Sequence, residues 1–126
     1  MPALDINIES TPDRLRPFRR NEVDFTARFS MSPGKEHYWI EALVEVEPPL
    51  SLAPDRHLKM GKINVGILSE GLSKEKRFKV FSNNDIFPNT FTLRITALVY
   101  DGDGAVADRK EVKYELECSD KDGKIL

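Results

Sequence analysis

The chain has 126 residues, the usual length of one domain, and 40% of them are hydrophobic, which excludes global disorder. Its 19 Lys and Arg residues nearly balance 21 Asp and Glu residues, and the net charge of −2 argues against a nucleic-acid-binding protein. No segment approaches the roughly 18 consecutive apolar residues of a transmembrane helix, so no membrane insertion is expected.

Hydrophobic and polar residues alternate along most of the chain. This period of two is typical of antiparallel strands that turn one face to a core and the other to water. β-branched and aromatic residues, which favour strands, are frequent in the alternating segments. The segments with clear alternation are residues 4–8, 23–31, 38–46, 91–99 and 112–118.

Two further segments alternate less regularly. In residues 58–68, the side chains of Ile63, Val65 and Ile67 are expected on one face of a strand, although glycines interrupt this segment. Residues 76–81 supply a second, shorter alternation. Together with the five clear segments, these predict about seven strands.

Turn-forming residues separate the segments, because Pro and Gly set or free the backbone and Asn and Asp bond to it. About seven strands with such turns predict an all-β fold, a two-sheet antiparallel sandwich of immunoglobulin-like type. We expect one domain over residues 1–126, with an ordered core of about residues 3–118 and a mobile C-terminal tail, residues 119–126. The main turn candidates are Pro33-Gly34, Pro48-Pro49, Pro54-Asp55, Asn83-Asn84-Asp85, Pro88-Asn89 and Asp101-Gly102-Asp103-Gly104.

The last strand carries an irregularity in its expected pairing. A hairpin that turns at residues 102–103 pairs Val99 with Val106, but the same register points Asp108 and Lys110 inward. A β-bulge around residues 107–109 would restore an apolar inner face for the rest of the strand.

Several stretches, taken in chain order, resemble one group of β-sandwich domains. They are Val23-Asp24-Phe25-Thr26, Val46-Glu47-Pro48-Pro49-Leu50, Val65-Gly66-Ile67-Leu68, Phe78-Lys79-Val80, Asn89-Thr90-Phe91-Thr92-Leu93 and Tyr100-Asp101-Gly102-Asp103-Gly104. This order is similar to the immunoglobulin-like domains of prokaryotic, including archaeal, surface proteins, the cell-adhesion-related group called CARDB. The resemblance implies an immunoglobulin-like fold and a structural role within a larger cell-surface protein, with no ligand of its own.

Residues that carry hydrolytic or cofactor chemistry are scarce. The histidines, His37 and His57, form no HxxxH pair and no CxxC pair occurs, so no zinc site is expected. No glycine-rich loop opens a helix for a nucleotide phosphate. Cys118, the single cysteine, lies on an apolar strand face and is interpreted as a small hydrophobe, with a nucleophile as the alternative. We predict no catalytic, cofactor-binding or metal-binding residues, no cofactor and no enzyme.

Two acidic segments leave calcium binding open as an alternative. Residues 120–125 place Asp, Asp, Gly and an apolar residue as in an EF-hand loop, but Cys118 occupies the first ligand position and no closing glutamate follows. Residues 101–104 are interpreted as a hairpin turn. As a metal site they would require a carboxylate from another loop, such as Asp55 or Asp85.

Four arginines, Arg14, Arg16, Arg19 and Arg20, cluster in the expected loop before the second strand. Their guanidinium groups could bind a carboxylate or a phosphate, which makes this segment a possible anion-contact loop. The alternative is that they are solvated and paired with nearby acidic residues.

Some apolar residues occupy positions where the alternation calls for polar ones. Trp39 and Leu43 are expected to point outward on the third strand, and Leu98 and Tyr100 on the sixth. These strands are antiparallel neighbours in immunoglobulin topology, so the four side chains would form one exposed patch, with Trp and Tyr as favoured anchors. The alternative is that a loop or the first strand covers the patch, or that Trp39 lies in the core.

The expected function is a non-catalytic protein-interaction or assembly module whose partner is another protein or a second copy of the chain. The alternative is the structural domain implied by the resemblance. No signal sequence is visible at the N-terminus, which predicts a cytoplasmic protein unless the chain is a fragment of a secreted one.

Overall fold

The computed structural model describes residues 4–31, 37–69 and 72–119, which form eight strands and no helix. The all-β fold class predicted from the alternation is therefore confirmed. Without a helix, this part of the chain offers no helical membrane span. The strands are β1 (Leu4–Thr11), β2 (Arg14–Leu15), β3 (Asn21–Met31), β4 (Tyr38–Val46), β5 (Met60–Leu68), β6 (Ser73–Ser82), β7 (Asn89–Tyr100) and β8 (Val106–Cys118).

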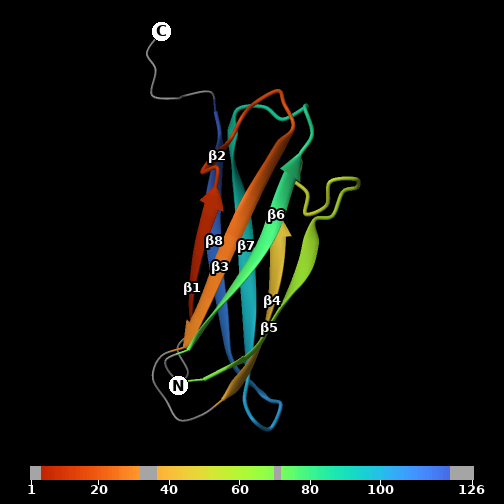
Figure 1. Cartoon of the computed structure of the whole chain (residues 1–126). Coiled ribbons are helices and arrows are strands. Elements are labelled where there is room, and N and C mark those ends of the chain that lie inside the picture. The colour runs from red at the N-terminus through yellow and green to blue at the C-terminus, as the bar shows by residue number, and fades with distance from the viewer. Residues whose placement is uncertain (1–3, 32–36, 70–71, 120–126) are drawn as a thin grey trace.

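The strands form two sheets, one in front of the other in Figure 1. Sheet A has the order β1-β3-β6, and sheet B has the order β2-β8-β7-β4-β5. All strand pairs are antiparallel except β2 with β8, which is parallel. The third and sixth segments of the sequence, now β4 and β7, are neighbours as expected.

One hydrophobic core lies between the two sheets. From β3, Val23, Phe25, Ala27 and Phe29 are fully buried, and β4 and β7 contribute buried residues from the opposite sheet. The ring of Phe25 stacks on Phe78 of sheet A and meets the edge of Tyr114 of sheet B, with ring centroids 5.2 and 5.5 Å apart. Aromatic rings in these arrangements stabilise a core beyond the area that they bury.

The segment between β1 and β3 passes from sheet A to sheet B. It was expected to be a loop, but Arg14 and Leu15 form the short strand β2 beside the end of β8. Leu15 is fully buried, and its carbonyl oxygen accepts a hydrogen bond from the backbone N–H of Ser119. The Asn21 side chain accepts a hydrogen bond from Arg16 N (2.8 Å) and donates one to Arg16 O (2.9 Å), which holds the turn that follows β2.

The expected bulge in the last strand is present at Ala107. Val106 pairs with Tyr100 and Asp108 pairs with Val99, so Ala107 has no partner in the β7–β8 register. An extra residue exchanges the two faces of a strand. The expected pairing of Val99 with Val106 is therefore wrong, and Val106 lies on the outer face of sheet B, the face turned away from sheet A. The bulge does not clear the inner face of polar residues as expected, because Asp108 and Lys110 pair with the buried Val99 and Ala97 and are half-buried there.

The position of Phe25 predicts that the Phe25→Ala substitution lowers the free energy of unfolding by about 3–5 kcal/mol, because it removes a fully buried ring and leaves a cavity. Thr26→Ala is the matched control on the outer side of the same strand, and should change stability by less than about 1 kcal/mol. Urea denaturation followed by circular dichroism measures both. Equal effects would contradict the position of the core.

Candidate functional site

Four large apolar side chains cross the outer face of sheet B in one line. The strand register pairs Ile67 of β5 with Trp39 of β4, Trp39 with Tyr100 of β7, and Tyr100 with Val106 of β8. Side chains directly opposite each other in an antiparallel pair lie on the same face, in contact distance. We call these four residues the apolar row. Exposed fractions are 55% for Ile67, 40% for Trp39 and 58% for Val106, and Tyr100 is half-buried.

Alternation turns the two central residues of the row outward. Trp39 precedes Ile40, and Tyr100 follows Val99, and both Ile40 and Val99 are fully buried in the core. The expectation that Trp39 and Tyr100 meet on one exposed face agrees with their position. The indole Nε1–H of Trp39 points along the surface and donates a long hydrogen bond of 3.4 Å to Glu41 Oε1.

Two irregularities turn the outer residues of the row outward as well. On β5 the register passes from Asn64 to Gly66, so Val65 has no partner, and Gly66 has a φ of 91°. The expectation that Ile67 shares a face with Val65 is therefore wrong, because Val65 is buried and Ile67 is exposed. The bulge at Ala107 has the same effect on β8. The glycine in the β5 alternation was the available signal for this bulge.

Leu43 and Leu98, the other two residues of the predicted patch, lie beside the apolar row. Leu43 pairs with Thr96 and Leu98 pairs with Glu41 on the same outer face. Both leucines are half-buried, and Leu98 lies diagonal to both Leu43 and Trp39, whereas Glu41 separates Leu43 from Trp39 on β4. The structure therefore places all four predicted patch residues on one face.

Sheet A has a polar outer face. Arg28 bonds to Glu75 at 3.0 Å, and Lys79 bonds to Glu22 at 2.9 Å. The hydrogen bond and the charge of Glu22, with a smaller contribution from Asp24, raise the pKa of Lys79. Such exposed pairs contribute little to stability but keep this surface charged. The row of large apolar side chains is thus a property of sheet B.

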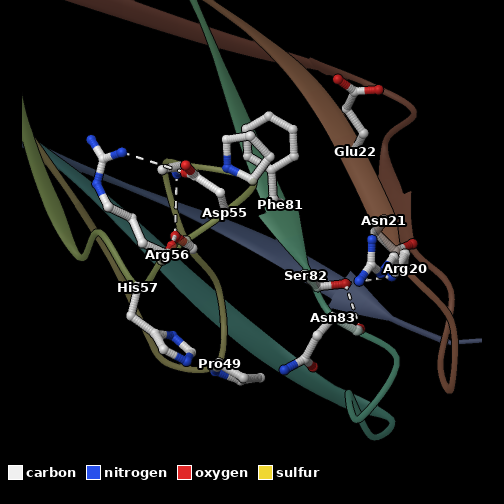
Figure 2. Close-up of a pocket in the computed structure, with 13 residues that line it drawn as sticks. Arg20, Asn21, Glu22, Pro49, Asp55, Arg56, His57, Phe81, Ser82 and Asn83 are labelled. Carbon is white, nitrogen blue, oxygen red and sulfur yellow. Dashed lines mark hydrogen bonds and ion pairs between the residues drawn. The ribbon is translucent and has the colours of Figure 1, made fainter.

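The four arginines of the possible anion-contact loop are divided by the structure. Arg14 and Arg16 flank the buried Leu15, and Arg14 lies opposite Glu117 in the β2–β8 register. Arg20 lies at the other end of the turn, where it lines the hollow shown in Figure 2.

This hollow lies between the start of β3, the end of β6 and the loop of residues 49–57, and has a volume of about 560 Å³. Ser51 ties the loop to β6 through two backbone hydrogen bonds with Phe81, of 2.9 and 2.7 Å. Figure 2 shows Arg56 and Arg20 on opposite sides, with Arg56 directed toward Asp55 at 3.4 Å. Catalysis or tight anion binding requires charged groups that converge on one point, and the charged groups of this hollow point in different directions.

A second exposed aromatic group, missed by the sequence reasoning, lies where the segment after β2 meets the β6–β7 loop. Phe18 and Phe87 are 61% and 65% exposed, and their rings meet edge to face with centroids 5.5 Å apart. Phe18 N donates a 2.8 Å hydrogen bond to Ile86 O, and Phe18 has a φ of 61°, which is uncommon outside glycine. This pair is small. The segment after β2 and the β6–β7 loop, which carry it, lie at the opposite end of the sheets from the β7–β8 turn (Figure 1).

The acidic turn between β7 and β8 is a hairpin, as predicted. One carboxylate oxygen of Asp101 accepts hydrogen bonds from the backbone N–H groups of Asp103 (2.9 Å) and Ala105 (3.0 Å). Within the described ranges, no group of three or more His, Cys, Asp or Glu residues could hold a metal ion. The EF-hand-like residues 120–125 lie outside these ranges. Cys118 is buried in the core, as expected of a small hydrophobe.

Comparisons of this chain with protein-family models, with curated proteins and with solved structures find no match. The apolar row, the divided arginines and the open hollow are thus the features from which function must be argued. Of these, the apolar row is the one in which several side chains of the same kind lie side by side on one face.

The exposure of Trp39 predicts that Trp39→Ser spares the fold, with a loss in free energy of unfolding below about 1 kcal/mol. Ile40→Ala is the adjacent control, and it should cost about 2–5 kcal/mol because Ile40 is fully buried. Chemical denaturation measures both variants. A loss for Trp39→Ser as large as that for Ile40→Ala would place Trp39 in the core instead.

Proposed function

We propose that this chain is a non-catalytic protein-interaction module that binds through the outer face of sheet B. The observation that carries the proposal is the apolar row, and above all the two bulges that complete it. Ile67 and Val106 would point inward in regular strands, and the unpaired Val65 and Ala107 turn both outward. Bulges next to functional sites commonly redirect a side chain in this way.

The composition of this face suits protein binding. Trp39 and Tyr100 are the residue types that most often dominate interface energies, because they bring large contact areas with few rotatable bonds. Isoleucine and valine extend the contact area on either side. Contiguous exposed apolar surface rimmed by polar residues is a mark of interaction sites.

Charged side chains border the apolar part of the face on the side of Leu98. Arg94 bonds to Glu111 at 3.3 Å, and Arg109 approaches the same carboxylate at 3.6 Å. These pairs lie on the outer face beside and beyond Leu98, because Arg109 pairs with Leu98 and Glu111 with Thr96. An apolar centre with a polar surround is the usual arrangement of a protein-binding surface.

We further infer that the two sheets form an immunoglobulin-like sandwich. Three features support this: the first strand divides between the sheets as β1 and β2, the third and sixth long segments are central neighbours in sheet B, and one core lies between the sheets. The resemblance to the CARDB group of surface-protein domains is compatible with the same topology. A fold of this type hosts many functions, so the apolar row, and not the fold, supports binding.

A structural domain of a larger cell-surface protein is the second candidate. One observation favours it: the start of β1 and the end of β8 lie at opposite ends of the sheets (Figure 1). Domains with such termini can follow each other in a string. A reading frame that continues into an export signal and further domains of this kind would favour this candidate.

Photo-crosslinking in cells of the source organism tests the interaction surface. Benzoylphenylalanine at position 67 should give a covalent adduct with a protein, either another protein or a second copy of the chain, because Ile67 is 55% exposed within the apolar row. The same group at position 77, which is exposed on the outer face of sheet A, is the control and should give no such adduct.

The Trp39→Ser substitution should abolish the adduct from position 67 while leaving the protein folded. Identification of the adduct by mass spectrometry distinguishes a partner protein from self-association. The proposal is contradicted by the absence of an adduct at position 67, by equal adducts from positions 67 and 77, or by an adduct that survives Trp39→Ser.

A further inference from the structure

β8 presents a long unpaired edge. It is the longest strand, with 13 residues, and β2 pairs only with its last two residues, Glu117 and Cys118. On the side away from β7, no strand within the described ranges pairs with residues 106–116. Unpaired backbone donors and acceptors along such an edge are a template for pairing with another strand.

The edge strands differ in charge, and this decides which could pair with a copy of itself. Like charges directly opposite each other destabilise a strand pair. β1 carries two acidic residues and no basic one, and β6 carries four basic residues and one acidic residue, so a copy of either strand would be repelled. β5 carries a single charge and contains a glycine with positive φ. β8 alone carries both signs in nearly equal number.

The charges on β8 also alternate in sign along one face. Arg109, Glu111, Lys113 and Glu115 pair in register with outward-facing residues of β7, so all four lie on the outer face. In an antiparallel pair of identical strands, a residue that precedes the symmetry axis faces one that follows it. Alternating signs therefore place opposite charges together when the axis lies between two of them.

The position of β2 selects the register. β2 occupies the place beside Glu117, so a second strand along this edge must end before that residue. A two-fold axis at Lys110 satisfies the limit, because residues 108–112 of one copy then face residues 112–108 of the other, and the bulge at Ala107 ends the regular pairing at residue 108. In this register Arg109 of each copy lies opposite Glu111 of the other on the outer face. The two Lys110 residues face each other at the axis, and each lies diagonal to Asp108 of the other copy, whose opposite charge offsets this like-charge pair.

We propose that the chain forms a symmetric dimer in which β8 pairs antiparallel with β8 of a second copy, about an axis at Lys110. The two five-stranded sheets join into one continuous sheet, and two reciprocal Arg109–Glu111 contacts set the register. This dimer uses the edge of sheet B and leaves the outer face with its apolar row free, so it does not depend on the proposed function.

Disulfide crosslinking tests the axis. Residues directly opposite each other in an antiparallel pair have Cα atoms about 4.5–5.5 Å apart, within the roughly 4.4–6.8 Å that a disulfide spans. In a Cys118→Ala background, Lys110→Cys should form a covalent dimer under mild oxidation. Lys76→Cys, on the open edge of β6, is the matched control and should remain monomeric.

Charge reversal tests the register by sedimentation equilibrium. Arg109→Glu or Glu111→Arg should each raise the dimer dissociation constant at least about tenfold, because each opposes like charges twice, and the double variant should restore it. Circular dichroism melting checks that each variant is folded, since Glu111 also bonds to Arg94.

Three results would overturn the proposal. The first is a monomer at every concentration together with equal crosslinking of Lys110→Cys and Lys76→Cys. The second is a dimer whose dissociation constant does not respond to charge reversal. The third is an assembly that grows without limit as concentration rises, which would indicate pairing between the acidic β1 edge and the basic β6 edge of successive copies.

Discussion

Antiparallel pairing has a side-chain period of two residues, and one extra residue in a strand exchanges the faces of the residues that follow it. The rest of this structure depends on that constraint. Tyr114 and Leu116 lie on the inner face of β8, and in a regular strand Val106 would share that face. The unpaired Ala107 turns Val106 away from the core. Without the unpaired Val65, Ile67 would point inward beside it. Two single residues therefore decide both what fills the core and what reaches the surface.

The two bulges have a common consequence, because they lie on either side of the central Trp39–Tyr100 pair. With regular strands, the row would consist of that pair alone. The bulges add Ile67 and Val106, so that the apolar row crosses four strands. Exposing apolar side chains to water is unfavourable. An arrangement that increases the number of exposed apolar side chains is therefore typical of a surface that a binding partner covers. The polar outer face of sheet A shows that the fold itself does not require such exposure.

The face and the edge of sheet B would serve different contacts. The face offers apolar area and anchor residues, which provide affinity for a partner with a complementary apolar surface. The edge of β8 offers backbone hydrogen bonds and alternating charges, which provide register and direction. A dimer formed through the edge would place two apolar rows on one continuous sheet, so that a partner with two binding sites could engage both.

The sequence by itself determined the seven long strands, most of the core and the outward position of Trp39, Leu43, Leu98 and Tyr100. It could do so because a period of two is a local property that the order of residues records directly. It also indicated a bulge near Ala107, although Asp108 and Lys110, the polar residues that suggested it, keep their inward positions. Only the tertiary structure decided that Ile67 and Val106 complete the row, that the arginines divide between two sides of a turn, and that the β8 edge is open. These depend on which strands pair and in which register, and such contacts join residues far apart in the chain.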